Sequence, residues 1–75
     1  MEQSAADVTA GAVRAEMARN RASLRDVAEA TGIKKTTLAR RLDGTYPFNV
    51  TELVAIADFL DVPLSVLLPP LQTVA

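Results

Sequence analysis

Cysteine and histidine are both absent from this 75-residue chain. Without cysteine there is no disulfide, no zinc–thiolate site and no thiol nucleophile. Without histidine the chain lacks the commonest metal ligand and the commonest general base. Carboxylates remain, but the sequence frames no pair of acids with other polar groups. We therefore expect no enzyme, no metal, no cofactor and no small-molecule ligand.

Long hydrophobic runs are also missing. The apolar stretches are far shorter than the roughly 20 residues that an α-helix needs to cross a bilayer. The N-terminal sequence MEQSAAD is acidic and polar, which is unlike a secretory signal. The sequence therefore predicts a cytoplasmic protein that does not insert into membranes.

Basic residues are few, and they are unevenly placed. The net charge is −1 and the pI is about 5.2, which taken alone argues against nucleic acid as a partner. All eight basic residues, however, lie between Arg14 and Arg41 with only three acids, so this segment has a formal charge of +5. The rest of the chain holds six acids and no base. This pattern predicts a basic face, although a chance cluster on a solvated surface would give it too.

Hydrophobic residues, by contrast, make up 49% of the chain. This is enough for one domain over residues 1–75 with a modest core. Apolar periodicity predicts helices and no strand. Ser4 with Asp7, Ser23 with Asp26 and Asn49 with Glu52 have the spacing of helix N-caps and their third-position partners. Gly32 and Gly44 have the place of helix stops. The five predicted helices cover residues 4–20, 23–32, 35–42, 50–60 and 64–68, although Asp7 or Thr9 could equally start the first.

The second and third predicted helices are the most informative pair. They are joined by the tight turn Gly32-Ile33-Lys34, and the later helix is rich in Lys, Thr and Arg. Two short helices in this order, over residues 23–44, are typical of a helix-turn-helix.

The sequence SLRDVAEATGIKKTTLARRLDG resembles the Cro/cI-type repressors of the XRE class. The resemblance rests on the capping Ser23, the pair Val27-Ala28, the turn Gly32-Ile33, the inward Leu38 and the closing Gly44. It continues through NVTELVAIADFLDVPLSVLL. It implies a compact, all-α, lambda-repressor-like domain of five helices. It also implies a transcriptional repressor or regulator of phage or prophage type that binds double-stranded DNA by sequence in the bacterial cytoplasm or nucleoid.

The resemblance also implies which residues would contact DNA. A recognition helix enters the major groove with its N-terminal residues nearest the base edges. By matching position, the base contacts would be Lys35, Thr36 and Arg40. The positions where phosphates would run are Ser23, Arg25, Lys34, Thr37, Arg41, Thr45 and Tyr46.

The chain departs from the family pattern at three positions. Leu24 replaces a glutamine that often braces a phosphate in the family. Lys34 replaces the usual hydroxyl residue that caps the recognition helix, and an ammonium group cannot accept the helix N–H bonds. Arg41 stands where the family often has an apolar residue, and Leu42 takes over that packing role.

Each candidate also has an ordinary structural interpretation. Lys35 and Arg40 could be solvated charges, and Thr36 could cap its own helix. Arg41 could pair with Asp43. Arg25 could pair with Glu29 on the second helix. Tyr46 and Phe48 could pack in the core beneath the fourth helix.

Residues 62–75 are nearly all apolar or proline, more than so small a core can cover. Exposed apolar patches usually mark a partner surface, so we expect a homodimer. A tail folded back on its own domain is the alternative. The expected dimer contacts are Leu64, Leu67, Leu68, Leu71 and Val74.

A second class of function is also open. The protein could be a protein-interaction module, such as an antitoxin or a phage protein that binds a host factor, and Leu24 and the low pI favour this alternative.

Overall fold

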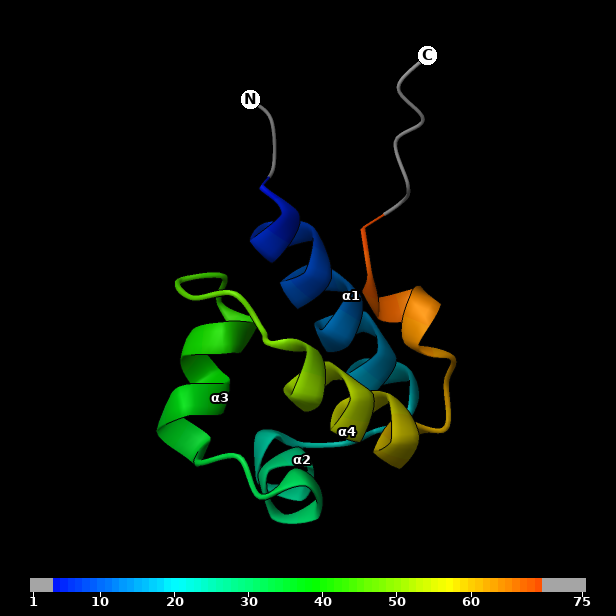
Figure 1. Ribbon diagram of the computed structural model, residues 1–75. Coiled ribbons are helices and arrows are strands. Elements are labelled where there is room, and N and C mark those ends of the chain that lie inside the picture. The colour runs from blue at the N-terminus through cyan, green and yellow to red at the C-terminus, as the bar shows by residue number, and fades with distance from the viewer. Residues whose placement is uncertain (1–3, 70–75) are drawn as a thin grey trace.

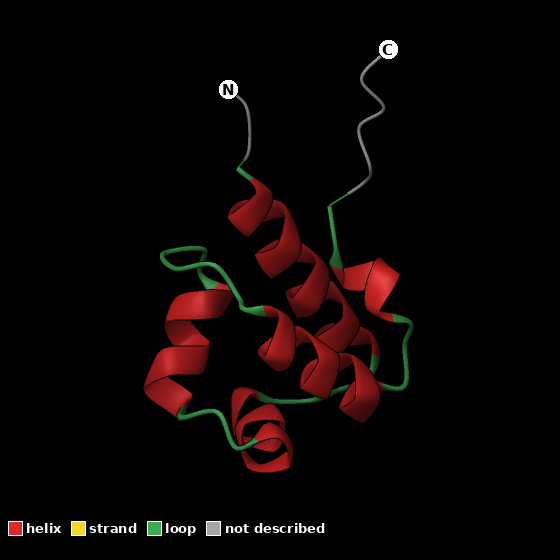
Figure 2. Cartoon of the chain, in the orientation of Figure 1, coloured by secondary structure: helices red, strands yellow, loops and turns green. Residues whose placement is uncertain are grey.

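The computed structural model describes residues 4–69, and the regular secondary structure of that range is all helical (Figures 1 and 2). Four α-helices are followed by one short 3₁₀ helix, and the described residues contain no strand. The elements are α1 (Ala5–Arg19), α2 (Leu24–Thr31), α3 (Lys35–Leu42), α4 (Val50–Leu60) and η1 (Leu64–Leu67). None of these helices is long and apolar enough to cross a membrane. The prediction of an all-α domain is confirmed over this range.

The predicted fifth α-helix over 64–68 is wrong in type. Those residues form η1, whose turns are closed by Val66 N–H to Pro63 O at 3.0 Å and Leu68 N–H to Ser65 O at 3.3 Å. Leu68 itself is extended, with φ −94° and ψ 153°, because the residue before a proline is driven out of the α region by that ring. Only four residues are then left for the helix, a length at which i→i+3 bonding is common.

The helix ends follow the capping residues that the sequence contains. Ser4 accepts the Asp7 N–H at 3.1 Å, so α1 begins one residue after it. Ser23 and Asp26 make both bonds of a capping box, at 3.1 and 2.9 Å. Each bond satisfies an N–H group that the first helical turn leaves without a partner. The predicted starts of these helices are therefore confirmed.

The core is formed where the helices converge. α2 packs against α3 and α4, while α1 packs against α3 and η1, and η1 also contacts α4. Every element contributes to the buried cluster, and α3 contributes only Leu38 to it. Its members are Val13, Met17, Val27, Ala28, Leu38, Leu53, Ile56, Ala57, Leu60 and Leu67.

Two glycines set the path of the chain around α3. Gly32 ends α2 with φ +78°, a left-handed conformation that glycine adopts without a Cβ clash. Gly44 follows α3 with φ +84°, and a Cβ there would also overlap the carboxylate of Asp7 from α1. The two glycines thus allow α2, α3 and the following loop to turn sharply enough to leave α3 at the edge of the molecule (Figure 1).

Candidate nucleic-acid interface

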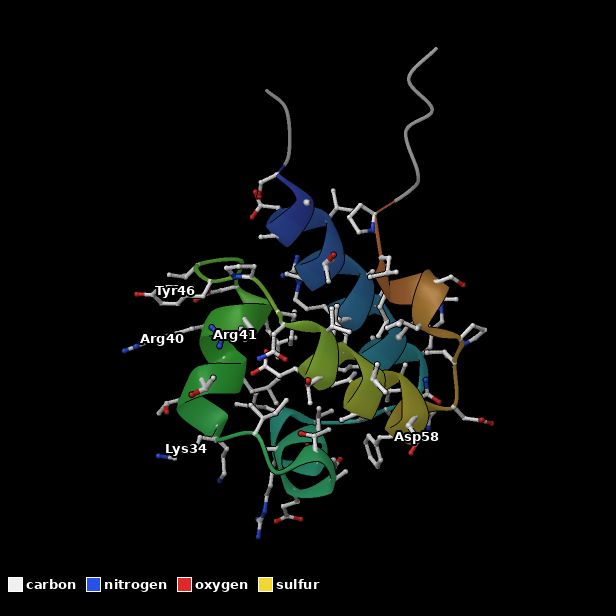
Figure 3. All side chains as sticks on the ribbon, viewed as in Figure 1. Lys34, Arg40, Arg41, Tyr46 and Asp58 are labelled. Atoms are coloured by element: carbon white, nitrogen blue, oxygen red, sulfur yellow. The ribbon has the colours of Figure 1, made fainter. Side chains whose placement is uncertain are left out.

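α3 presents one face to the core and a wider face to solvent. Leu38 is fully buried and Leu42 is half-buried against the core, as the departure from the family pattern predicted. Lys35, Thr36 and Arg40 are all exposed. Arg40 extends away from the body of the domain in Figure 3. The three predicted base-contacting residues therefore share the accessible face of one helix.

The start of α3 carries positive charge and has no side-chain cap. Lys34 occupies the N-cap position in extended backbone, and its side chain makes no capping hydrogen bond. Lys34 and Lys35 are both exposed, beside the helix end where the backbone dipoles place partial positive charge. This end of the helix favours an anionic partner such as a phosphate.

Arg25 makes the ion pair that was its structural alternative. Its Nε lies 3.1 Å from Glu29 Oε1, with 74% and 66% of the two side chains exposed. Such an exposed pair contributes little free energy, so the arginine can leave it at small cost. Nearby, Ser23 is exposed but uses its hydroxyl oxygen in the α2 capping box. Leu24 packs against the core and offers no polar group to a phosphate.

The loop after α3 is held by its own hydrogen bonds. Asp43 Oδ1 accepts the hydroxyl of Thr45 and, at 2.8 Å, the Thr45 N–H. These two bonds, the hydroxyl first, lower the pKa of Asp43 below its ordinary value. The loop is thereby fixed beside the C-terminal turn of α3, and the side chain of Thr45 is exposed on it. Thr37, another predicted phosphate contact, lies on α3 and is half-buried.

Tyr46 and Phe48 differ from each other, although one interpretation of the sequence placed both in the core. Phe48 is half-buried and packs on the core cluster, as that interpretation predicted. Tyr46 is 49% exposed, so a core role for it is wrong. Its N–H donates to Arg40 O at 3.4 Å, and its ring extends to the same side of the molecule as Lys34 and Arg40 (Figure 3).

Arg41 does not lie free for a phosphate, and it does not pair with Asp43. Its Nε is 3.1 Å from Oε1 of Glu52 on α4, and only 22% and 13% of the two side chains are exposed. An arginine held in this pair is poorly placed for a phosphate, so Arg41 is left out of the phosphate contacts proposed below. Helical phase explains the difference, because Arg41 is rotated by one residue from Arg40 and faces α4.

Sequence reasoning missed two residues that act on α3. One is Glu52, which was recognised as a cap but not as the partner of Arg41. The other is Arg14 of α1, whose Nη1 donates to the carbonyl of Leu42 at the end of α3. Both contacts join different helices, so no local spacing in the sequence could indicate them.

The apolar segment after α4 is partly absorbed by the domain itself. Leu67 is fully buried, so its predicted place in a dimer contact is corrected, and Leu64 is half-buried on the same core. Leu68 is 41% exposed, close to the exposed Val66. The remaining predicted contacts, Leu71 and Val74, lie outside the described residues.

Comparison with known proteins agrees with this geometry. A family model described as helix-turn-helix matches residues 14–67. Among solved structures, that of the clp gene regulator ClgR from C. glutamicum is similar, with a TM-score of 0.82 and 20% sequence identity over 88% of this chain and 86% of that one. At this identity the likeness concerns the fold. A search of curated proteins found no match. Because the family model covers well over half of the chain, this protein belongs to the XRE-type helix-turn-helix family.

Proposed function

We propose that this domain binds double-stranded DNA by sequence and regulates transcription, with α3 in the major groove. The observation that carries the proposal is the exposed face of α3, where Lys35, Thr36 and Arg40 point to solvent above a single buried anchor, Leu38. A short helix mounted in this way can enter the groove without disturbing the core. The similarity in fold to a protein described as a gene regulator is in keeping with this role.

The proposed contacts divide by chemistry. Lys35 and Arg40 would bond O6 and N7 of guanine, and Thr36 would bond a base edge or touch a thymine methyl group. Residues at the ends of α2 and α3 and in the loop after α3 would fix the register on the backbone. In the proposed phosphate set are Ser23, Arg25, Lys34, Thr37, Thr45 and Tyr46.

The low net charge is compatible with this function where basic and acidic side chains lie on different sides of the domain. Lys34 and Arg40 lie on one side of the domain, and Asp58 on α4 lies on the other side (Figure 3). A charge distribution of this kind orients a protein in the field of DNA during its approach. We infer that the basic side faces the phosphates, and that the protein represses transcription by occupying its site.

We further infer that the domain binds as a homodimer. Phe59, Val66 and Leu68 keep 43%, 41% and 41% of their surface exposed, around the end of α4 and η1. Large apolar side chains that stay exposed favour a partner of the same chemistry. A symmetric dimer would place two α3 helices about 34 Å apart, so the operator would be an inverted repeat.

Selection of bound sequences from a random duplex library tests the proposal most directly. We expect one enriched motif, an inverted repeat, and an affinity for it that falls steeply as salt rises, because counterions are released from the phosphates. No enriched motif and no salt-dependent binding would instead favour the protein-interaction module.

A further inference from the structure

The Arg41–Glu52 pair differs from the other arginine–glutamate pair of this geometry in the domain. Both Arg41–Glu52 and Arg25–Glu29 have an Nε–Oε1 distance of 3.1 Å. The Arg25 pair is solvated, with 74% and 66% exposure, and lies within one helix. The Arg41 pair is withdrawn from water, with 22% and 13% exposure, and joins α3 to α4. Withdrawal from water makes the second interaction stronger and more geometrically demanding than the first.

Glu52 also connects this pair to the start of α4. The same oxygen, Oε1, accepts the Asn49 N–H at 3.0 Å, and Asn49 Oδ1 accepts the Glu52 N–H at 2.7 Å. The carboxylate is therefore fixed by a capping box before it meets Arg41. As a result, the last turn of α3 is bonded to a rigid point on α4.

The last turn of α3 is also held by α1, through the bond from Arg14 to the Leu42 carbonyl. At the other end of α3, Lys34 provides no side-chain cap. Burial of Leu38 fixes how deeply the helix sits, but apolar burial has no preferred direction. Hydrogen bonds do have one, so they are what fixes the rotation and tilt of the helix.

We propose that Arg41 and Glu52 are positioning residues that set the orientation of α3, and thereby the base discrimination of the neighbouring Arg40, without touching DNA. This inference rests on the proposed DNA-binding function. Buried ion pairs contribute less to stability than to the choice of one arrangement over others in several proteins, and here the arrangement is the angle of the reading helix.

The test compares Arg41→Met, Glu52→Gln and the double variant on the selected operator and on random duplex. Glutamine keeps an amide oxygen for the Asn49 N–H, so the α4 cap survives, but it loses the negative charge, which weakens the charge-assisted bond to Arg41. We expect each single variant to lower the ratio of specific to random affinity by at least about fivefold, the discrimination of one weak base contact. Affinity for random duplex and its salt slope should stay unchanged, and the double variant should be no worse than the worse single variant.

The matched control is Glu29→Gln, which removes the same charge from the exposed pair and should leave the ratio unchanged. If Arg41 contacted phosphate instead, Arg41→Met would weaken binding to all duplexes and lower the salt slope by about one unit, while Glu52→Gln would not. That outcome, or an unchanged ratio in both single variants, overturns the proposal.

A second readout requires no DNA. In the free protein, both single variants should lower the hydrogen-exchange protection of the α3 amides relative to those of α1, because α3 loses a fixed contact. Unchanged α3 protection in both variants overturns the positioning role. A wild-type protein that bound no duplex would refute the proposed function, and the exchange comparison would still decide whether the pair holds the helix.

Discussion

Single side chains on α3 divide into those that would read bases and those that would hold the backbone. We predict that Lys35→Ala or Arg40→Ala costs ~1–3 kcal/mol on the selected operator and relaxes the preference at one base position. Lys34→Ala should weaken all duplexes alike and reduce the salt slope by about one unit, because Lys34 lies at the helix end. Titration of operator and random duplex at several salt concentrations separates the two effects.

Leu38→Ala serves as the control for these variants. Leu38 is fully buried, so its truncation should lower the free energy of unfolding by ~2–5 kcal/mol and leave the base preference of the folded fraction unchanged. Equal losses on operator and random duplex for Lys35→Ala and Arg40→Ala would show that both side chains act only through charge.

Asp26 makes the stability of the domain sensitive to acid. The Ser23 N–H, and to a smaller extent the Ser23 hydroxyl, hold the pKa of Asp26 below its ordinary value. The folded protein therefore binds this proton less readily than the unfolded chain does. The resulting stabilisation is present above the ordinary carboxyl pKa, near 4, and is lost as the pH falls through the folded value.

We predict that Asp26→Asn is less stable than the wild type at neutral pH and that the two melting temperatures converge as the pH is lowered. Thermal melts across the acid range measure this directly. A constant difference between the two proteins at every pH would show that the Asp26 carboxylate is not responsible.

At the scale of whole elements, how far the sequence predicts the structure depends on how local the cause is. Ser4 and Asn20 flank α1 as caps, and Asn49 begins α4, because a cap requires only the residues of one turn. The type of η1 depends on Leu68 meeting Pro69 and on packing against α1 and α4. The partner of Arg41 is Glu52 on another helix, and no regular spacing in the sequence connects these two residues.

The cap of α4 provides a prediction for the element as a unit. Asn49→Ala removes the acceptor for the Glu52 N–H, so we expect a loss of about 1 kcal/mol, within a range of about 0.5–2. In a domain of this size that loss lowers the melting temperature by roughly 4–8 °C. Urea or thermal unfolding measures it.

Asn49→Asp is the matched control, because an aspartate keeps the accepting oxygen and suits the positive end of a helix. It should unfold within a few tenths of a kcal/mol of the wild type. If both variants lost the same stability, the asparagine would matter for some contact other than the cap.

At the scale of the whole molecule, the exposed apolar residues near η1 predict self-association. We expect Leu68→Glu to shift the protein from dimer to monomer in sedimentation at micromolar concentration, because a carboxylate would lose its hydration in the contact. Binding to the inverted repeat should weaken, while binding to a single half-site should remain.

Val54→Glu is the comparison variant, since Val54 is 49% exposed but lies in the middle of α4. It should sediment as the wild type does. A wild-type protein that stays monomeric at high concentration, both free and on the operator, would contradict the dimer.

The single buried anchor of α3 has a consequence for how such a domain could change its target. Lys35, Thr36, Ala39 and Arg40 are exposed, so replacing them removes little packing and leaves the fold intact. Mutation could therefore explore new operators at these four positions without a stability penalty that would first have to be compensated. A library randomised there, with Leu38, Arg41 and Glu52 kept, is a natural starting point for DNA-binding variants of altered specificity, and the same freedom would let duplicated copies of the gene diverge toward separate sites.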